Sequence, residues 1–179
     1  GRGVYFSTKF LLQEEGKDIK DATVAIQGMG NVGSNAARIF YHRDIKVVAV
    51  SDVSGGLYKK SGLDITDISD YLETKGNLLK DYNAPGVEHI TNEELLTCEC
   101  DVLIPAALEN QITAEVAEKV KCSYIIEAAN GPTSEAGDVV LENRGIPVIP
   151  DIFANCGGVI VSYFEWVQNI QELTWSRER

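Results

Sequence analysis

The stretch with the clearest capacity for binding chemistry is GMGNVG, at residues 28–33. Glycines with this spacing let a chain turn sharply, bring backbone N–H groups close to a pyrophosphate, and pack a helix near a sheet. The spacing alone is weak evidence, because a tight turn between a strand and a helix also needs glycines without any ligand. The candidate dinucleotide-binding residues of this turn are Gly28, Gly30, Asn31, Val32 and Gly33.

The segments around the turn favour a nucleotide site. ATVAIQ (22–27) is an apolar run typical of a buried strand, and residues 31–42 follow it with a helical pattern. A second strand is predicted at 45–52 and ends in Asp52, where the dinucleotide-binding fingerprint places an acidic residue. A carboxylate at this position can bind the ribose hydroxyls of adenosine. The turn and Asp52 together therefore predict a dinucleotide site.

Asp52 also bears on which nicotinamide cofactor is bound. A carboxylate accepts a hydrogen bond from the free 2′-hydroxyl of NAD and repels the 2′-phosphate of NADP. No Arg or Lys stands directly after Asp52. NAD is therefore favoured over NADP. Lys59 and Lys60 keep the NADP alternative open, although lysines at such a place are also typical of a solvated turn.

Small and amide residues follow three of the predicted strands. Ligands of open α/β sheets bind at the carboxyl ends of strands, so these residues are candidate cofactor contacts. Alanines leave room for a flat ring, and an asparagine amide can both donate to and accept from a carboxamide or a ribose hydroxyl. An Asx-turn or a helix cap would explain each asparagine as well. The candidates are Ala106, Asn130 and Asn155.

Strand and helix patterns alternate along the whole chain. Further strands are predicted at 86–90, 101–107, 122–129 and 146–151. Further helices are predicted at 3–15, 64–76, 91–97, 113–120, 133–145 and 155–173. This alternation predicts βαβ units, and nearly continuous apolar strands indicate that both faces of the sheet are covered. We predict a single α/β domain over 1–179, with a Rossmann-like, doubly wound, mostly parallel sheet and helices on both faces.

Two predicted helices carry more specific expectations. Thr91 is expected to cap the helix over 91–97, with Glu94 at the capping-box position. The helix over 155–173 carries an apolar stripe whose helical spacing is typical of core packing. The residues of this stripe are Ile160, Tyr163, Phe164, Val167 and Ile170.

Composition limits the class of protein. The chain has 179 residues, a common length for one domain, and its net charge of −11 argues against nucleic-acid binding and gives no support for attachment to an anionic membrane. The four cysteines form no C-x-x-C pair, so we assign no metal site and expect reduced thiols. The sequence shows no signal segment and no apolar run long enough to span a membrane, so we expect a cytoplasmic protein.

Longer stretches of the sequence resemble a known family. They are GRGVYF, VAIQGMGNVG, SDVSGGLYKKSGLD, IPAALENQIT, IEAANGPTS and PDIFANCGGVIVSYFEWVQN. Together they resemble the nucleotide-binding domain of hexameric glutamate dehydrogenases, from Gly1 to about Gln171. The segment VSYFEWVQN is more similar to glutamate dehydrogenases than to the leucine, valine or phenylalanine dehydrogenases.

The resemblance implies an enzyme that oxidatively deaminates L-glutamate to 2-oxoglutarate and ammonia, with hydride transfer to NAD. It implies that Ala106, Asn130 and Asn155 line the cofactor cleft near the nicotinamide and its ribose. It also implies that Ser162 contacts the side-chain carboxylate of glutamate. Judged by its place in the sequence alone, Ser162 is a mid-helix serine, and such residues are usually inert or bonded back to a carbonyl.

The catalytic lysine and aspartate of that family lie on a separate, earlier domain, and no GGAKGG-like run occurs in this chain. His42 and His89 read as structural or surface residues. We therefore assign no catalytic residue and expect the cofactor domain of a longer homo-hexameric enzyme. Alone, the chain is expected to be monomeric, to bind NAD weakly and to leave glutamate unreacted. Two alternatives stay open: the cofactor domain of a leucine, valine or phenylalanine dehydrogenase, and a stand-alone nucleotide-binding regulatory module.

Overall fold

The computed structural model of the chain describes residues 1–172 and 175. The strands are β1 (Thr23–Gln27), β2 (Lys46–Asp52), β3 (Gly55–Tyr58), β4 (Glu88–Ile90), β5 (Val102–Pro105), β6 (Tyr124–Ile126) and β7 (Val148–Ile149). The α-helices are α1 (Arg2–Glu14), α2 (Asn31–Tyr41), α3 (Ile65–Glu73), α4 (Asn92–Leu96), α5 (Ala114–Lys119), α6 (Glu135–Asn143), α7 (Asp151–Ala154) and α8 (Cys156–Gln171). Two short 3₁₀ helices are η1 (Ile19–Asp21) and η2 (Leu79–Asp81).

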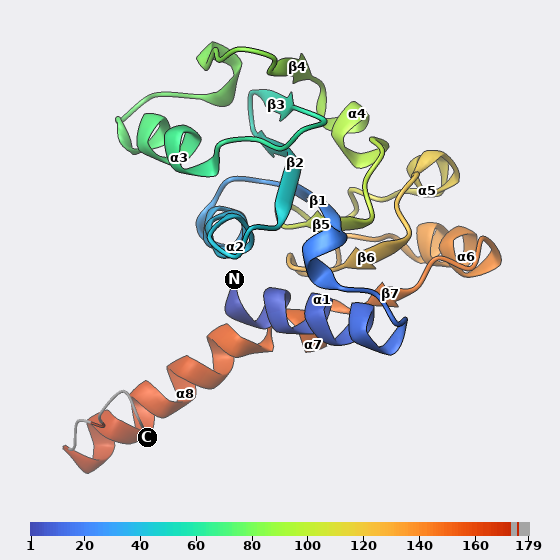
Figure 1. The fold of residues 1–179 in the computed structure, drawn as a ribbon. Helices are drawn as coiled ribbons and strands as arrows, with labels where there is room; N and C mark the ends of the chain where they lie inside the picture. Colours follow the sequence, from blue (N-terminus) through green and yellow to red (C-terminus); the bar gives the residue numbers. More distant parts are fainter. Residues whose placement is uncertain (173–174, 176–179) are drawn as a thin grey trace.

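The sheet is mostly parallel and has the strand order β4-β3-β2-β1-β5-β6-β7 (Figure 1). The central strand β1 pairs in parallel with β2 on one side and with β5 on the other. β6 and β7 extend the parallel part beyond β5. β3, in contrast, runs antiparallel to both of its neighbours. The strand order therefore reverses at β1, and ligands of open α/β sheets bind at such a reversal.

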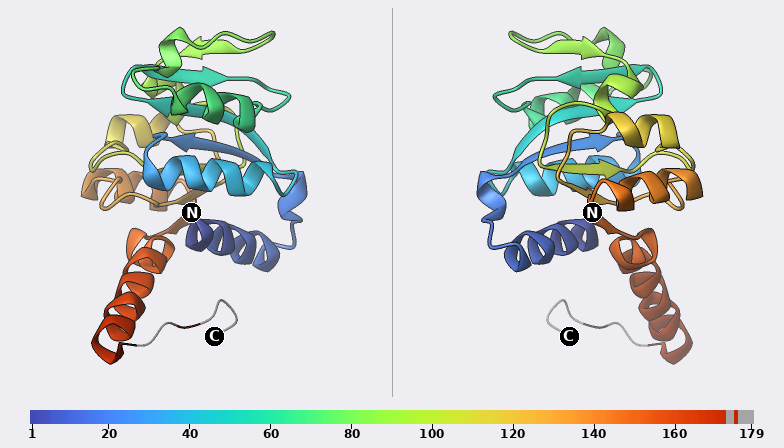
Figure 2. Two further views of the ribbon diagram at one scale, coloured as in Figure 1. Left: turned by 90° about the vertical axis from the view of Figure 1, so that its left-hand side faces the viewer. Right: turned by 90° about the vertical axis from the view of Figure 1, so that its right-hand side faces the viewer.

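Helices cover both faces of the sheet, and the two views of Figure 2 look onto one covered face each. Alternate side chains of β1 point to opposite faces. Val24 and Ile26 belong to a buried cluster with residues of α1, α2 and α3. Ala25 belongs to a second cluster with residues of α4, α5 and α6. The predicted fold class, a doubly wound α/β sheet with helices on both faces, is confirmed.

No strand was predicted between Asp52 and the helix over 64–76, but Gly55–Tyr58 form strand β3. Asp52 pairs with Gly55, whose φ of 142° allows the chain to reverse tightly. A four-residue strand that begins with two glycines carries no alternation of apolar side chains, so nothing in its sequence marks it as a strand.

At the C-terminal end of the described chain, the short helix α7 precedes α8. The predicted helix end at Leu173 lies outside the described residues.

The apolar stripe of α8 is exposed except at the half-buried Val167, contrary to the core packing that its spacing suggested. Tyr163, Phe164 and Ile170 are 57%, 44% and 61% exposed. The helix projects away from the sheet in every view (Figures 1 and 2). Helical periodicity identifies an apolar stripe but does not reveal what covers it. No helix in the described part of the chain is long and apolar enough to cross a membrane.

The cysteine thiols lie in different environments and should react at different rates. Burial raises the pKa of the Cys122 thiol to about 12, whereas a hydrogen bond from Cys100 lowers the pKa of Cys98. Because the thiolate is the nucleophile, we expect iodoacetamide at about pH 8 to alkylate Cys98 at least about tenfold faster than Cys122. Peptide mass mapping over time measures both rates. Unfolding in urea should abolish the difference, and equal rates in the folded chain would contradict the expectation.

Candidate cofactor site

The glycine turn joins β1 to α2, as predicted. Gly28 is buried and has a φ of 94°, which few residues other than glycine adopt. A Cβ atom on Gly33 would lie 1.7 Å from the carbonyl oxygen of Gly28, so α2 passes too close to the turn for any side chain there. A Cβ atom on Gly30 would meet no atom within 4 Å. Gly28 and Gly33 thus allow close packing, and Gly30 leaves space in front of α2.

The first turn of α2 presents N–H groups that no side chain caps among the described residues. Its N-cap residue is Gly30, which has no side chain to accept a hydrogen bond. Asn31 and Val32 belong to this first turn and are exposed. Unpaired N–H groups and the helix dipole attract anions to a helix N-terminus. This end of α2 is therefore suited to hold a pyrophosphate.

Asp52 ends β2, and three hydrogen bonds fix its carboxylate. Its Oδ1 accepts from the backbone N–H and the hydroxyl of Ser54, at 2.7 and 2.5 Å. Its Oδ2 accepts from the backbone N–H of Leu79, at 2.9 Å. A carboxylate has about four acceptor positions, two on each oxygen. One position on Oδ2 is therefore left for a hydroxyl group of a ligand.

The glycine turn and Asp52 line the same cleft, which has a volume of about 590 Å³ and lies at the carboxyl ends of β1, β2 and β5. Ligand pockets of proteins commonly have this size. The apolar residues that line it are Met29, Val53, Leu72, Leu78, Ala106, Ala107 and Leu108. The polar side chains that line it are Gln27, Ser51, Asp52, Asn77, Asn92 and Gln111.

The structure brings some of the other predicted site residues together and leaves one apart. Ala106 lines the cleft beside the glycine turn. Asn130 and Asn155 meet outside the cleft lining, where the Nδ2 of Asn155 donates to the Oδ1 of Asn130 at 2.8 Å. Ser162 is exposed on α8 and does not line the cleft. Apart from Ser162, the predicted residues therefore form one group at the cleft and a second group near the ends of β6 and α7.

Lys59 and Lys60, which left NADP as an alternative cofactor, do not line the cleft. The Nζ of Lys59 donates to the carbonyl oxygen of Pro85 at 3.1 Å. His42 and His89 are exposed and also lie outside the cleft lining, which agrees with their reading as surface residues.

Several residues of the cleft were missed in the sequence. Asn77 and Leu78 reach it from the segment after α3, which the Leu79 hydrogen bond holds beside Asp52. Ser51 accepts a hydrogen bond from the backbone N–H of Gly28 at 3.2 Å and so ties β2 to the turn. The place of Ser51 next to Asp52 was a signal that could have revealed it. Asn77 and Leu78 have no comparable local pattern.

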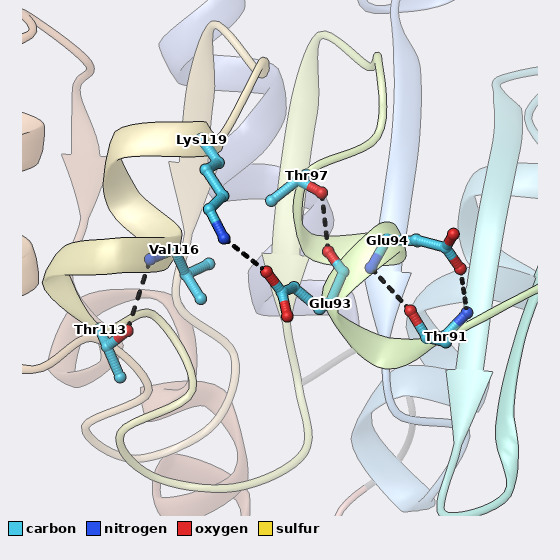
Figure 3. Close-up of polar contacts among 7 residues, drawn as sticks. All are labelled: Thr91, Glu93, Glu94, Thr97, Thr113, Val116 and Lys119. Atoms are coloured by element: carbon cyan, nitrogen blue, oxygen red, sulfur yellow. Dashed lines mark hydrogen bonds and ion pairs between the residues drawn. The ribbon is translucent and has the colours of Figure 1, made fainter.

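Helices α4 and α5 support one wall of the cleft. Thr91 and Glu94 form the predicted capping box: the Thr91 hydroxyl accepts from the backbone N–H of Glu94 at 3.2 Å, and the Glu94 carboxylate accepts from the backbone N–H of Thr91 at 2.7 Å (Figure 3). Glu93 forms an ion pair with Lys119 at 2.8 Å and so joins α4 to α5. The capping box is confirmed, and it fixes the start of α4 at the edge of the cleft.

Replacing Thr91 with alanine is expected to cost about 1 kcal/mol of unfolding free energy, because the N–H of Glu94 loses its acceptor. The hydrogen bond from the Thr91 N–H lowers the pKa of Glu94. The Glu94 carboxylate therefore stabilises the folded chain at neutral pH, and this stabilisation is lost as the pH falls through the lowered pKa. Urea unfolding at neutral and acidic pH measures both effects. Thr97→Ala is the control, since its hydroxyl only donates back to the carbonyl of Glu93. Equal losses in both variants would contradict the capping role.

Comparisons with known proteins identify the family of the chain. The sequence profile of the Glutamate/Leucine/Phenylalanine/Valine dehydrogenase family matches residues 1–179. The chain is 51% identical to glutamate dehydrogenase A2 of Halobacterium salinarum over 178 residues, covering 99% of this chain and 42% of that protein. It is 46% identical to a cryptic catabolic NAD-specific glutamate dehydrogenase of Bacillus subtilis over 177 residues, covering 99% of this chain and 40% of that protein.

Solved structures show the same relationship. The hetero-hexameric glutamate dehydrogenase of Thermus thermophilus in its leucine-bound form superimposes with a TM-score of 0.87 at 32% identity, covering 98% of this chain and 41% of that chain. The glutamate dehydrogenase of Peptoniphilus asaccharolyticus superimposes with a TM-score of 0.76 at 35% identity, covering 97% and 39%. The chain thus spans about two fifths of the length of the relatives that it matches. It belongs to the glutamate/leucine/phenylalanine/valine dehydrogenase family.

Proposed function

We propose that this domain binds NAD in the cleft at β1, within an enzyme that oxidatively deaminates L-glutamate to 2-oxoglutarate and ammonia. The observation that carries the proposal is the uncapped N-terminus of α2, which shares one cleft with the Asp52 carboxylate. An anion-binding helix end beside a hydroxyl-binding carboxylate fits the pyrophosphate and the ribose of a dinucleotide. The named activities of the relatives from Halobacterium and Bacillus support glutamate as the substrate.

Different residues would then contact different parts of the cofactor. The first turn of α2 would hold the pyrophosphate, and Oδ2 of Asp52 would accept from the 2′-hydroxyl of the adenosine ribose. Ala106 would flank the cofactor beside the turn. Asn130 and Asn155 would meet the nicotinamide ribose beyond the cleft, and Ser162 would contact the side-chain carboxylate of glutamate. When bound, NAD supplies the acceptor for the hydride that leaves the substrate.

We propose NAD over NADP because Asp52 would repel a 2′-phosphate and because Lys59 and Lys60 lie outside the cleft lining. The NAD-specific relative from Bacillus supports the same choice. We also propose that the whole enzyme is a homo-hexamer whose proton-transfer residues lie outside this chain. The chain alone would be a monomer that binds NAD weakly and does not oxidise glutamate.

The variant Gly30→Ser tests the anion site. Gly30 has a φ of −75° and a ψ of −165°, and its Cβ position is open, so serine fits there and can cap α2. The serine hydroxyl would occupy the N–H groups that we assign to the pyrophosphate. We expect the unfolding free energy to rise by a few tenths of a kcal/mol. We expect the affinity for NAD to fall roughly tenfold or more, as measured by calorimetric titration.

Gly16→Ser is the matched control, because the Cβ position of Gly16 is also open and this residue lies after α1, outside the cleft lining. Its left-handed φ of 69° makes the variant less stable, but the NAD affinity should stay at the wild-type value. NAD binding that is unaffected by Gly30→Ser would reject the α2 terminus as the pyrophosphate site. A folded wild-type chain that binds no NAD would reject the cofactor role of this domain.

A further inference from the structure

Three side-chain amides meet at the wall of the cleft, on residues from three separate elements. Gln27 ends β1, Asn92 begins α4, and Gln111 lies between β5 and α5. The Nε2 of Gln27 donates to the Oδ1 of Asn92 at 3.0 Å and to the Oε1 of Gln111 at 2.9 Å. Both hydrogens of the Gln27 amide are therefore used within this cluster, which we call the amide triad.

The hydrogen bonds of Gln27 fix which way the other two amides point. Their carbonyl oxygens face Gln27, so their NH₂ groups are turned away from it. The Nε2 of Gln111 donates one hydrogen bond, to the carbonyl oxygen of Glu109 at 3.2 Å. The Nδ2 of Asn92 makes only a long contact of 3.5 Å with the Oε1 of Gln111. An amide NH₂ group has two hydrogens, so Asn92 and Gln111 each keep a donor for a ligand.

The triad is also incomplete as a purely structural network. Gln27 is 1% exposed, and its Oε1 accepts no hydrogen bond from any described residue. Buried polar atoms in folded proteins are nearly always paired, because an unpaired one costs free energy. A network retained for stability alone would be expected to satisfy its own acceptors. Together with the two free donors, this points to a binding role.

The backbone around Asn92 and Gln111 is held firmly on both sides. The capping residue Thr91 directly precedes Asn92, and Thr113, two residues after Gln111, accepts from the backbone N–H of Val116 at 3.4 Å to cap α5 (Figure 3). The Glu93–Lys119 ion pair joins the two helices. The two amide donors are thus positioned before any ligand arrives, which lowers the entropy cost of binding.

We propose that Asn92 and Gln111, oriented by Gln27, form a subsite that binds the adenine ring through its ring nitrogen acceptors. This inference rests on the proposed function. The triad lines the same cleft as Asp52, which we assign to the adenosine ribose, whereas Asn130 and Asn155 lie outside that lining. The base in this cleft is therefore adenine, and not nicotinamide. Apolar side chains such as Val53 and Leu108 offer the faces of the ring a surface, while the amides meet its polar edge.

The test compares ADP with its 1-deaza, 3-deaza and 7-deaza analogues, each of which replaces one ring nitrogen by C–H. Calorimetric titration of the chain should show at least one analogue binding about tenfold more weakly than ADP. In Gln27→Leu, the amides lose their fixed orientation, and this difference should shrink to less than about threefold. Because Gln27 is buried, the double variant Asn92→Leu/Gln111→Leu provides a second measurement if Gln27→Leu does not fold. In this double variant, ADP and its deaza analogues should bind with equal affinity.

Asn83→Leu is the matched control, since Asn83 is an exposed amide outside this cleft and should keep the wild-type ratio. If all three analogues bind as tightly as ADP while NAD still binds, the adenine subsite is wrong and the proposed function stands. An undiminished difference in the double variant would also overturn the subsite. A folded chain that binds neither NAD nor ADP would overturn the proposed function, and the subsite with it.

Discussion

Replacing Gly33 with alanine is expected to destabilise the domain by about 3 kcal/mol or more, at or above the upper end of the usual cost of overpacking. The added Cβ would lie 1.7 Å from the Gly28 carbonyl oxygen and 3.5 Å from the Cγ2 of Ile26. The first contact is with backbone, so no side-chain rotation can relieve it. Either α2 moves away from the sheet or the turn opens, and both disturb the buried side chains of α2.

Urea unfolding measures the loss, and Gly30→Ala is the matched control. Its Cβ meets no atom within 4 Å, so it should cost only about 1 kcal/mol or less, through a poorer N-cap. The same substitution, three residues apart, therefore separates a glycine required by packing from one that leaves space for a ligand. Similar unfolding midpoints for the two variants would contradict the close approach of α2 to Gly28.

Local sequence patterns were enough to predict those features of the cleft that are formed by residues close together in the sequence. The turn, the helix that it opens and the acidic strand end all follow from residues adjacent in the chain. The capping box of Thr91 and Glu94 follows for the same reason, because its two partners are three residues apart. The sheet class was predictable because continuous apolar strands between helices have few other ways to bury both faces.

The rest of the site depends on contacts between distant parts of the chain. Gln27 is 65 residues from Asn92 and 84 from Gln111 along the sequence, and only the strand order brings them together. Leu79 reaches Asp52 across 27 residues. These contacts cannot be predicted from any single segment of the sequence, because each contact depends on how β1, β2 and β5 are paired in the sheet. The stripe on α8 failed as a core prediction for a related reason: periodicity does not identify the surface that covers it.

The hydrogen bonds of Asp52 give this residue two separable roles. Its Oδ1 is saturated by Ser54, and its Oδ2 binds Leu79 with one acceptor position to spare. The carboxylate therefore holds the segment after α3 beside the cleft and also lines the cleft itself. The two roles have different readouts, because one affects the affinity for the cofactor and the other affects the unfolding free energy.

Asp52→Asn is expected to lower the affinity for NAD about tenfold, because the ribose hydroxyl loses a charged acceptor. The affinity for NADP should rise, because the repulsion of its 2′-phosphate is removed. The structural role gives a second readout: an asparagine amide has only one carbonyl oxygen, so either Ser54 or Leu79 loses its acceptor, and urea unfolding should show a loss of about 1–2 kcal/mol. Asp70→Asn, on an exposed acid of α3 outside the cleft lining, should change neither quantity. If stability falls while the NAD-to-NADP ratio stays constant, Asp52 only holds the segment after α3, and the choice of cofactor lies with other residues.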